Sequence, residues 1–481
     1  MAQNFDLAAA ARQEMIEHGF DPDFHADVER QLASIHPQPD NGLRDLTALL
    51  WSSIDNDDSR DLDQIEWAER TATGIRVLVG VADVDSLVAK ATPIDCHAAR
   101  ETTTVYAGIR TFPMLPERLS TDLTSLNEEQ DRAAVVIEFV VATDGTFSAP
   151  TIYRARVRNR AQLAYNGVGP WLENTGAAPA KVAASAELAA QLKLQDEAAC
   201  CLREARHRLG ALTFDRSEAE TVIANGHVQE VRSRTANRAA HLIEDFMIAA
   251  NEVMAQTLRQ AGVSSIRRVV KAPERWERIV ELAARYGEKL PPEPDAAALN
   301  GVLMRRKQAD PDHYPDVSLT VLKLMGPGEY VLMRPEDDPQ GHFGLAAHDY
   351  THSTAPNRRF ADMVTQRLIK AHAAGAPSPY SDAELDAAAR NCTLKEDAAR
   401  KVQRDMNKRL AAAALRNRVG QTFSGVVTGV TPKGVFVRVM EPPVEGRLMR
   451  GEQGLDVGDR LHVRLLSTDP QRGFIDFARA S

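Results

Sequence analysis

The residues with the clearest chemical potential lie in the stretch SSIDNDDSRDLDQIEW, residues 52–67. Five aspartates fall within nine positions of this stretch: Asp55, Asp57, Asp58, Asp61 and Asp63. Carboxylates this close together repel one another, and the repulsion raises their pKa values unless a positive charge lies among them. The function of the stretch therefore depends on which positive charge it accommodates.

Three interpretations of this acidic loop are open. Most charge runs are solvated surface loops, which is the simplest case. An EF-hand would place Asp55 at position 1 and Glu66 at position 12, but its required glycine is replaced by Arg60 and the flanking segments are strand-like. The third interpretation is a divalent-metal site at the end of a strand. There Asp55, Asp61 and Asp63 supply the oxygen ligands that Mg²⁺ prefers, and two ions about 4 Å apart hold the attacking and leaving oxygens of a phosphodiester.

Length and composition indicate a globular protein of two or three domains. The chain has 481 residues, of which 43% are hydrophobic and 26% charged. No apolar run approaches the roughly 20 residues that span a membrane, and the four cysteines lack metal-ligand spacing. We therefore expect a cytoplasmic protein without a membrane segment. The net charge of -9 argues against nonspecific coating of nucleic acid but allows a local basic channel.

The apolar pattern divides the chain into three parts, residues 1–42, 43–418 and 419–481. The first part predicts two short helices and a turn-rich linker, HPQPDNG at 36–42. The middle part mixes strands with helices, and the last predicts a small five-stranded barrel of the OB type, because short alternating segments are separated by glycine and Asp-Pro turns. We expect an α+β fold with strands at 74–84 and 133–147, the latter ending in an Asp-Gly hairpin turn, and helices at 181–209, 234–261 and 381–418.

Four sequence blocks resemble one enzyme family. IDNDDSRDLDQ resembles the metal-binding signature of the ribonuclease II and ribonuclease R exoribonucleases, whose catalytic part is called the RNB domain. Residues 79–127 resemble its segment with the I-A-D and P-M-L-P elements, LIEDFMIAAN (242–251) its helix, and HFGLAAHDYTHSTAPNRRFADM (342–363) its H-F-G-L…R-R-Y-x-D block. The C-terminal barrel resembles the RNA-binding domain first described in ribosomal protein S-one. The blocks follow family order across residues 43–418.

The resemblance implies a Mg²⁺-dependent 3′→5′ exoribonuclease. Members of this family take single-stranded RNA into a narrow channel, 3′ end first, and hydrolyse it to nucleoside 5′-monophosphates. The expected fold is an RNB-type domain, in which helices pack on a sheet, followed by the OB-fold barrel. We expect a monomer whose partner is single-stranded RNA. The alternative is a relative that binds RNA but has lost hydrolysis.

The resemblance also implies roles for individual residues. Asp55, Asp61, Asp63 and the position of Gln64 correspond to the metal-binding signature, whereas Asp57 and Asp58 fall in its variable, solvated part. Asp63 and Arg358 correspond to catalytic residues, Arg358 contacting the phosphate at the cleavage point. Arg359 better fits a surface salt bridge.

Four positions besides Arg358 correspond to RNA contacts. Tyr165 and Glu244, which are also assigned with Asp63 and Arg358 to the catalytic set, match the residues at the 3′-terminal nucleotide, where a carboxylate beside the ribose hydroxyls is one physical means of preferring RNA over DNA. Asp245, next to Glu244 on its helix, is expected to point elsewhere. Tyr106 and Phe214 match the aromatic pair that bounds the stacked bases.

The sequence departs from the family in three respects. The signature ordinarily ends in a further aspartate, which is Gln64 here, and Thr124 stands where cysteine is usual. A neutral amide removes one negative charge, so we expect a greater need for metal and an ability to work with Mn²⁺ in place of Mg²⁺. The two N-terminal OB-fold domains of the family are also missing from this sequence. RNA outside the channel is therefore expected to rely on the C-terminal barrel, where Arg438, Arg447, Arg450, Arg460 and Arg464 are candidate phosphate contacts.

Overall fold

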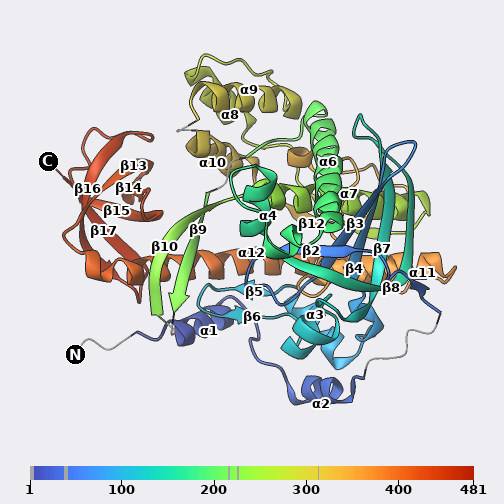
Figure 1. Ribbon diagram of the computed structural model, residues 1–481. Helices are drawn as coiled ribbons and strands as arrows, with labels where there is room; N and C mark the ends of the chain where they lie inside the picture. The colour runs from blue at the N-terminus through green and yellow to red at the C-terminus, as the bar shows by residue number, and fades with distance from the viewer. Residues whose placement is uncertain (1–4, 37–41, 215–216, 225–226, 312–313, 481) are drawn as a thin grey trace.

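The computed structural model describes residues 5–36, 42–214, 217–224, 227–311 and 314–480. The predicted linker at 36–42 therefore falls largely outside the described residues. The chain folds as a mixed α+β part within residues 43–418, called the catalytic part only after the family domain that it resembles, followed by a closed barrel at one end (Figure 1). Within the described ranges, no helix combines the length and the apolar character needed to cross a bilayer.

The N-terminal segment contains the two expected helices, α1 (Leu7–Glu17) and α2 (Ala26–Ser34). Asp6 caps α1 by accepting hydrogen bonds from the backbone N–H groups of its first turn. Ala11, Met15 and Phe20 are buried in one apolar cluster with residues of the long C-terminal helix. This segment is therefore attached to the catalytic part by its own hydrophobic contacts.

The central sheet has the strand order β1-β8-β2-β3-β4-β7. The strands are β1 (Arg44–Asp45), β2 (Trp51–Asp55), β3 (Gln64–Arg70), β4 (Ile75–Ala82), β7 (Asp131–Val141) and β8 (Phe147–Ala164). The first part of β8 pairs antiparallel with β7, and its last part pairs parallel with β2, so the sheet curves back on itself. β4 is apolar and buried almost throughout because both of its faces are covered.

The pairing of β2 with β3 is short and has consequences for the site. The two strands pair at Ser52 and Glu66, and beyond this pair β2 continues toward its end at Asp55 beside β8. The loop 56–63 joins them and contains the remaining aspartates of the acidic stretch. The strands on both sides of this loop exclude the EF-hand interpretation, which needs helices there.

Helices and short elements surround this sheet. The helices of the first half of the catalytic part are α3 (Pro93–Glu101), α4 (Tyr165–Leu172), α5 (Ala180–Ala183) and α6 (Ala186–Arg208). Those of the second half are α7 (Arg238–Gln260), α8 (Trp276–Arg285), α9 (Ala296–Ala309), α10 (Tyr314–Met325) and α11 (Phe360–Ala373). The small strand pairs are β5 (Val105–Tyr106) with β6 (Thr111–Phe112), β9 (Ser217–Ala224) with β10 (His227–Thr235), and β11 (Ser265–Val269) with β12 (Glu329–Met333). Short helical turns complete the catalytic part at η1 (Val84–Ser86), η2 (Leu119–Leu123) and η3 (Phe343–Leu345).

A long helix, α12 (Asp382–Ala414), joins the catalytic part to the barrel (Figure 1). It begins with a capping box between Ser381 and Glu384, and the short turn η4 (Arg416–Arg418) follows it. The barrel closes in the order β13-β14-β15-β17-β16, from β13 (Thr422–Thr431), β14 (Gly434–Val439), β15 (Val444–Arg450), β16 (Arg460–Asp469) and β17 (Phe474–Arg479). Ala412 and Leu415 are buried in the same apolar cluster as the barrel interior.

The predicted fold class is confirmed. β4 lies within the predicted strand at 74–84, and β7 and β8 form the hairpin whose Asp144-Gly145 turn was expected. α6, α7 and α12 occupy the three predicted helical segments, and the barrel contains the five strands expected within residues 419–480.

Candidate active site

The end of β2 and the start of β3 position the carboxylates of the acidic loop. Asp55 is the last residue of β2, where its Oδ1 accepts hydrogen bonds from the Asn56 backbone at 2.7 Å and from the Ser59 hydroxyl at 3.0 Å. Asp61 and Asp63 lie at the end of the loop, just before β3. Asp57 and Asp58 are exposed at its tip, as expected for the variable part.

Asp63 is the most deeply buried of these aspartates, with 1% of its surface exposed. Its Oδ1 accepts a hydrogen bond from the Asn357 backbone at 3.0 Å, and its Oδ2 lies 3.3 Å from Nε of Arg358. Burial raises the pKa of Asp63 to about 7, and the Arg358 charge opposes that rise. The positive charge nearest to the deepest aspartate is therefore an arginine side chain.

Asp362 stabilises the loop that carries Arg358. This buried carboxylate accepts a hydrogen bond from the Ala355 backbone at 2.8 Å and pairs with Arg359 at 2.7 Å. Arg359 thus forms a salt bridge, but a partly buried one that supports the loop and not the surface pair that was predicted. Arg358 keeps 45% of its side chain exposed, so its guanidinium is accessible to a ligand.

Thr124 contributes to the same arrangement. Its hydroxyl lies 2.6 Å from Oδ1 of Asn357 and 2.8 Å from the carbonyl of Leu119. The Asn357 backbone N–H is the group that donates to Asp63. The residue that replaces the usual cysteine therefore orients the turn that contacts the deepest aspartate.

Two tyrosines lie beside the carboxylates. The Tyr106 hydroxyl donates to Oδ2 of Asp61 at 3.5 Å, and its ring is 41% exposed. Burial raises the pKa of Tyr106 to about 12 and also raises that of Asp61. Tyr165 opens α4 directly after β8, and burial together with the negative charge of Asp55 raises its pKa. Both phenols are therefore neutral donors at the edge of an acidic site.

Glu66 is a residue that the sequence interpretation did not assign to the site. It is completely buried on β3, and burial together with the charge of Asp55 raises its pKa well above the ordinary range. It lies two residues after Gln64, which is also buried. The alternation of side chains along a strand would have placed it on the Gln64 face, and this was the available signal.

Phe214 and Glu244 line a neighbouring cavity of about 820 Å³. Glu244 contacts His241 at 3.3 Å, and this contact lowers the pKa of Glu244. Asn56 and Arg234 also line the cavity and hydrogen-bond to each other, and the Arg234 guanidinium lies 6.0 Å from the centre of the Tyr165 ring. The cavity thus reaches the residue adjacent to Asp55, while the other carboxylates lie outside its lining.

Asp245 faces away from this cavity, as the sequence predicted. It is buried against α6, where Arg203 donates to Oδ2 at 2.6 Å and Arg206 donates to Oδ1. The two adjacent acids of α7 therefore have different surroundings: Glu244 faces open space and Asp245 is a structural ion pair.

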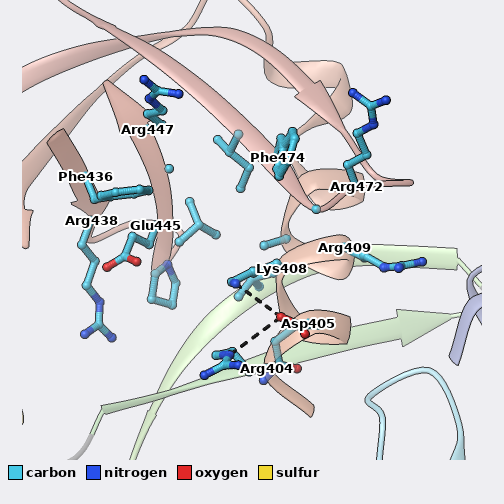
Figure 2. Close-up of a pocket in the computed structure, with 18 of the residues that line it drawn as sticks. Arg404, Asp405, Lys408, Arg409, Phe436, Arg438, Glu445, Arg447, Arg472 and Phe474 are labelled. Carbon is cyan, nitrogen blue, oxygen red and sulfur yellow. Dashed lines mark hydrogen bonds and ion pairs between the residues drawn. The ribbon is translucent and has the colours of Figure 1, made fainter. Parts of the chain in front are cut away.

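A second hollow, the basic groove, lies between α12 and the barrel and has a volume of about 1160 Å³. Figure 2 shows basic side chains from both walls, Lys408 and Arg409 from α12 and Arg438, Arg447 and Arg472 from the barrel, together with Phe436 and Phe474. Among the predicted barrel arginines, Arg438 and Arg447 line the groove, whereas Arg450, Arg460 and Arg464 lie outside its lining. The contribution of α12 was not predicted.

The donor set of the acidic loop fits a hard divalent cation. Asp55 at the end of β2 and Asp61 and Asp63 in the loop before β3 supply carboxylate oxygens, and Glu66 on β3 adds a buried carboxylate that has no partner among the described residues. Among the described residues, these carboxylates do not form a trio with ligand oxygens all within 4.8 Å of one another. In the part of the chain that the structure describes, Glu14, His18 and Asp405 form such a trio, but Arg409 pairs with Glu14 and Lys408 pairs with Asp405.

The fold and this site define a class of protein that comparison with known sequences identifies. Residues 43–375 match the RNB domain, and residues 421–480 match the RNase II-type exonuclease C-terminal S1 domain. The chain belongs to the RNB family.

Curated relatives within this family are named Ribonuclease R. The protein of Mycoplasma pneumoniae is 30% identical over 495 residues, which cover 95% of this chain and 67% of the relative. That of Escherichia coli K12 is 29% identical, covering 94% of this chain and 60% of the relative. The chain thus spans about 55 to 67% of the length of the relatives that it matches.

Solved structures agree on the fold. The apo form of Mycoplasma genitalium RNase R matches with a TM-score of 0.88 at 23% identity, over 99% of this chain and 78% of that one. Yeast Ssd1, a pseudonuclease, matches with a TM-score of 0.74 at 18% identity, over 92% of this chain and 55% of that one. Because a protein named as a pseudonuclease has the same fold, the arrangement of residues must decide the activity.

Proposed function

We propose that this protein is a divalent-metal-dependent 3′→5′ exoribonuclease that hydrolyses single-stranded RNA to nucleoside 5′-monophosphates. The observation that carries the proposal is the arrangement around Asp63. A buried aspartate lies 3.3 Å from an accessible arginine, at the end of a loop with two further carboxylates. A site with carboxylates for metal ions and a guanidinium for a phosphate suits phosphodiester hydrolysis.

The RNA path follows from the two hollows. Arg400 of α12 lines both the basic groove and the cavity of Phe214 and Glu244. The cavity in turn reaches Asn56, next to Asp55. The shared Arg400 supports a route by which a strand held in the groove by arginines and aromatic rings enters the cavity beside Asp55 with its 3′ end first.

The side chains divide the work of hydrolysis. Water adds to the phosphorus of the last phosphodiester, and the bond to the 3′ oxygen of the preceding ribose breaks as that oxygen gains a proton. Asp63 positions Arg358 through Nε, which leaves the other guanidinium nitrogens to bind phosphate oxygens. Glu244 accepts hydrogen bonds from the terminal ribose hydroxyls, while Phe214 and Tyr106 stack on bases and Tyr165 contacts the last nucleotide.

Asp55, Asp61 and Asp63 would hold the metal. Bound Mg²⁺, or Mn²⁺ in its place, supplies charge that polarises the phosphate and lowers the pKa of the attacking water. The buried setting of Asp63 strengthens these interactions because little water screens them.

Relatives support the substrate class. Mycoplasma genitalium RNase R has been solved in complex with ribose methylated single-stranded RNA and in complex with double-stranded RNA. For the present chain we propose single-stranded RNA as substrate, action as a monomer, and a cytoplasmic location. Residues 1–42, 43–418 and 419–481 are the proposed helical segment, RNB domain and RNA-binding barrel.

A second candidate is an RNA-binding relative without hydrolysis, because Gln64 removes one carboxylate from the signature. Incubating 5′-labelled single-stranded RNA with the purified protein and Mg²⁺ separates the two. The proposed enzyme yields a ladder that shortens from the 3′ end and releases 5′-monophosphates. Intact RNA that remains bound to the protein, with both Mg²⁺ and Mn²⁺, would establish the non-hydrolytic candidate.

A further inference from the structure

Because of Gln64, the metal-binding signature has one carboxylate fewer than in the family. Glu66 lies two residues after Gln64 on the same strand. Both residues belong to β3, where Gln64 pairs with Val81 and Glu66 with Val79 on β4. Residues two apart in a strand point to the same face of the sheet. Glu66 is therefore on the face of the missing aspartate, one step farther along the strand.

Glu66 differs from every other buried acid in the described part of the chain. Nine carboxylic acids are buried there, and eight of them form an ion pair with arginine or lysine: Glu14, Asp63, Asp83, Asp95, Glu101, Asp196, Asp245 and Asp362. Glu66 has no such partner among the described residues, and neither of its carboxylate oxygens receives a hydrogen bond. A buried carboxylate without a donor or a cation is costly, so its retention calls for a ligand.

The surroundings of Glu66 also contain unsatisfied oxygens. Ser52, the cross-strand neighbour of Glu66 on β2, is completely buried with an unpartnered hydroxyl. Gln195 of α6 donates to the Glu66 backbone carbonyl at 3.3 Å, while its own side-chain oxygen is unpartnered and buried. Glu66, Ser52 and Gln195 are thus neighbours in the fold, and each has a buried side-chain oxygen without a partner among the described residues.

The paired strands relate Glu66 to Asp55 at the end of β2. Burial and the charge of Asp55 raise the pKa of Glu66, and burial together with the charges of Asp55 and Glu66 raises the pKa of Tyr165. Asp55 ends the strand that pairs with β3 at Glu66. Asp55 is thus three residues along β2 from the cross-strand neighbour of Glu66, and Tyr165 follows β8, which pairs with β2 at Asp55.

We propose that Glu66 is a metal-binding residue of this protein and supplies the carboxylate that Gln64 has removed. The signature then retains four acidic groups, Asp55, Asp61, Asp63 and Glu66, with the fourth moved two residues along β3. Alternate residues of a strand are about 6.6 Å apart, and the glutamate side chain, one methylene longer than aspartate, offsets part of that distance. This inference rests on the proposed metal-dependent hydrolysis and deepens it.

Divalent-cation binding to the RNA-free full-length protein tests the inference. Mn²⁺ and Mg²⁺ titrations by calorimetry would compare the parent with Glu66→Gln, with Gln64→Asp/Glu66→Gln and with Glu69→Gln. We expect Glu66→Gln to weaken the cation dissociation constant by about tenfold or more. The double variant returns the carboxylate to position 64 and should recover most of that loss. Glu69→Gln, on the exposed part of the same strand, should bind cations like the parent.

Thermal unfolding gives a second readout. Without cations, Glu66→Gln should melt at or above the parent temperature, because an unpartnered buried carboxylate has been replaced by a neutral amide. With Mn²⁺ its rise in melting temperature should be smaller than that of the parent. If Glu66→Gln does not fold, Glu66→Asp, which keeps the charge but shortens its reach, should still show several-fold weaker binding.

The failures of the two proposals are distinguishable. Cation affinity equal to the parent in Glu66→Gln would overturn the role of Glu66, whether or not the parent cuts RNA. Weak binding that the double variant does not recover would likewise overturn it, because the loss would then be structural. A parent that binds cations through Glu66 but leaves RNA intact would overturn the proposed hydrolysis alone.

Discussion

The acidic site at the end of β2 and the basic groove beside the barrel use charge in opposite ways. In the acidic site a few buried carboxylates are each placed by one or two specific contacts, as Asp63 is by Asn357 and Arg358. In the groove, exposed arginines and lysines from two walls present a broad positive surface (Figure 2). Desolvated charges act strongly over short distances, whereas exposed charges act weakly and sum.

This difference teaches where each step of the function is vulnerable. A single substitution in the acidic site should act on the rate of cleavage and leave RNA binding nearly intact. A single substitution in the groove should act slightly on affinity and on its salt dependence, and hardly on the rate with saturating RNA.

Asp63→Asn should abolish most cleavage at the acidic site without weakening RNA binding. The amide keeps the volume and the acceptor for the Asn357 N–H but loses the charge that holds metal and pairs with Arg358. We expect single-turnover cleavage to fall by more than about 10³-fold, roughly 4 kcal/mol of transition-state stabilisation. RNA affinity measured by fluorescence anisotropy should change little. Turnover within tenfold of the parent would remove Asp63 from the chemistry.

Arg358→Lys should separate phosphate binding from loop support. Lysine keeps the charge but loses the planar fork, so we expect about a 10²-fold lower cleavage rate with an unchanged melting temperature. Arg359→Lys is the matched control, because Arg359 pairs with buried Asp362 beneath the same loop. It should lower the melting temperature more than Arg358→Lys does. Equal rate losses without destabilisation in both variants would contradict the different roles of the two arginines.

Arg438→Gln combined with Arg447→Gln should test the groove. Each phosphate contact removed from a single strand lowers the slope of log affinity against log salt by about 0.7, so the pair should lower it by about 1.4. The maximal rate should stay within about threefold of the parent, since the acidic site is unchanged. Arg450→Gln combined with Arg460→Gln, outside the groove lining, is the control pair. An equal change of slope in the control would show that barrel charge acts without regard to position.

Glu244→Ala tests recognition of the 3′-terminal ribose in the cavity between the two regions. Glu244 is exposed in the cavity that joins them, so we expect a small change in overall affinity but a several-fold loss of discrimination against a 2′-deoxy 3′ end. Oligonucleotides with one deoxyribose at each of the last positions measure this directly. Asp245→Asn, which disrupts the ion pairs with Arg203 and Arg206, should lower stability instead. Unchanged rejection of the deoxy end in Glu244→Ala would exclude its contact with the terminal ribose.

Much of this molecule could be predicted because local pattern and tertiary structure agree. The apolar run of β4, the Asp-Gly turn between β7 and β8, and the alternation in the barrel each indicate their own element. The lobe of α8 to α10 was not predicted. Its helices bury Trp276, Leu299 and Tyr314 in a cluster of their own, which no local pattern connects.

The sequence predicted which residues belong to the site but not how they are arranged in space. Asp63 and Arg358 lie 295 positions apart in sequence, and only the folded chain brings them within 3.3 Å. The role of Arg359 was misjudged because its partner, Asp362, is buried by the surrounding helices and not by its neighbours in sequence. Glu66 escaped notice because its significance lies in the absence of a partner among the described residues, which is a property of the fold.

The manner in which α12 meets the barrel has a mechanical consequence. The helix is 33 residues long, about 50 Å, and its end supplies Ala412 and Leu415 to the barrel interior. The barrel thus packs on the end of a long helix that also contacts β12 and α1. We therefore expect the RNA to move one nucleotide at a time past a fixed groove and a fixed acidic site. The distance between the bound segment and the cleaved bond should stay constant.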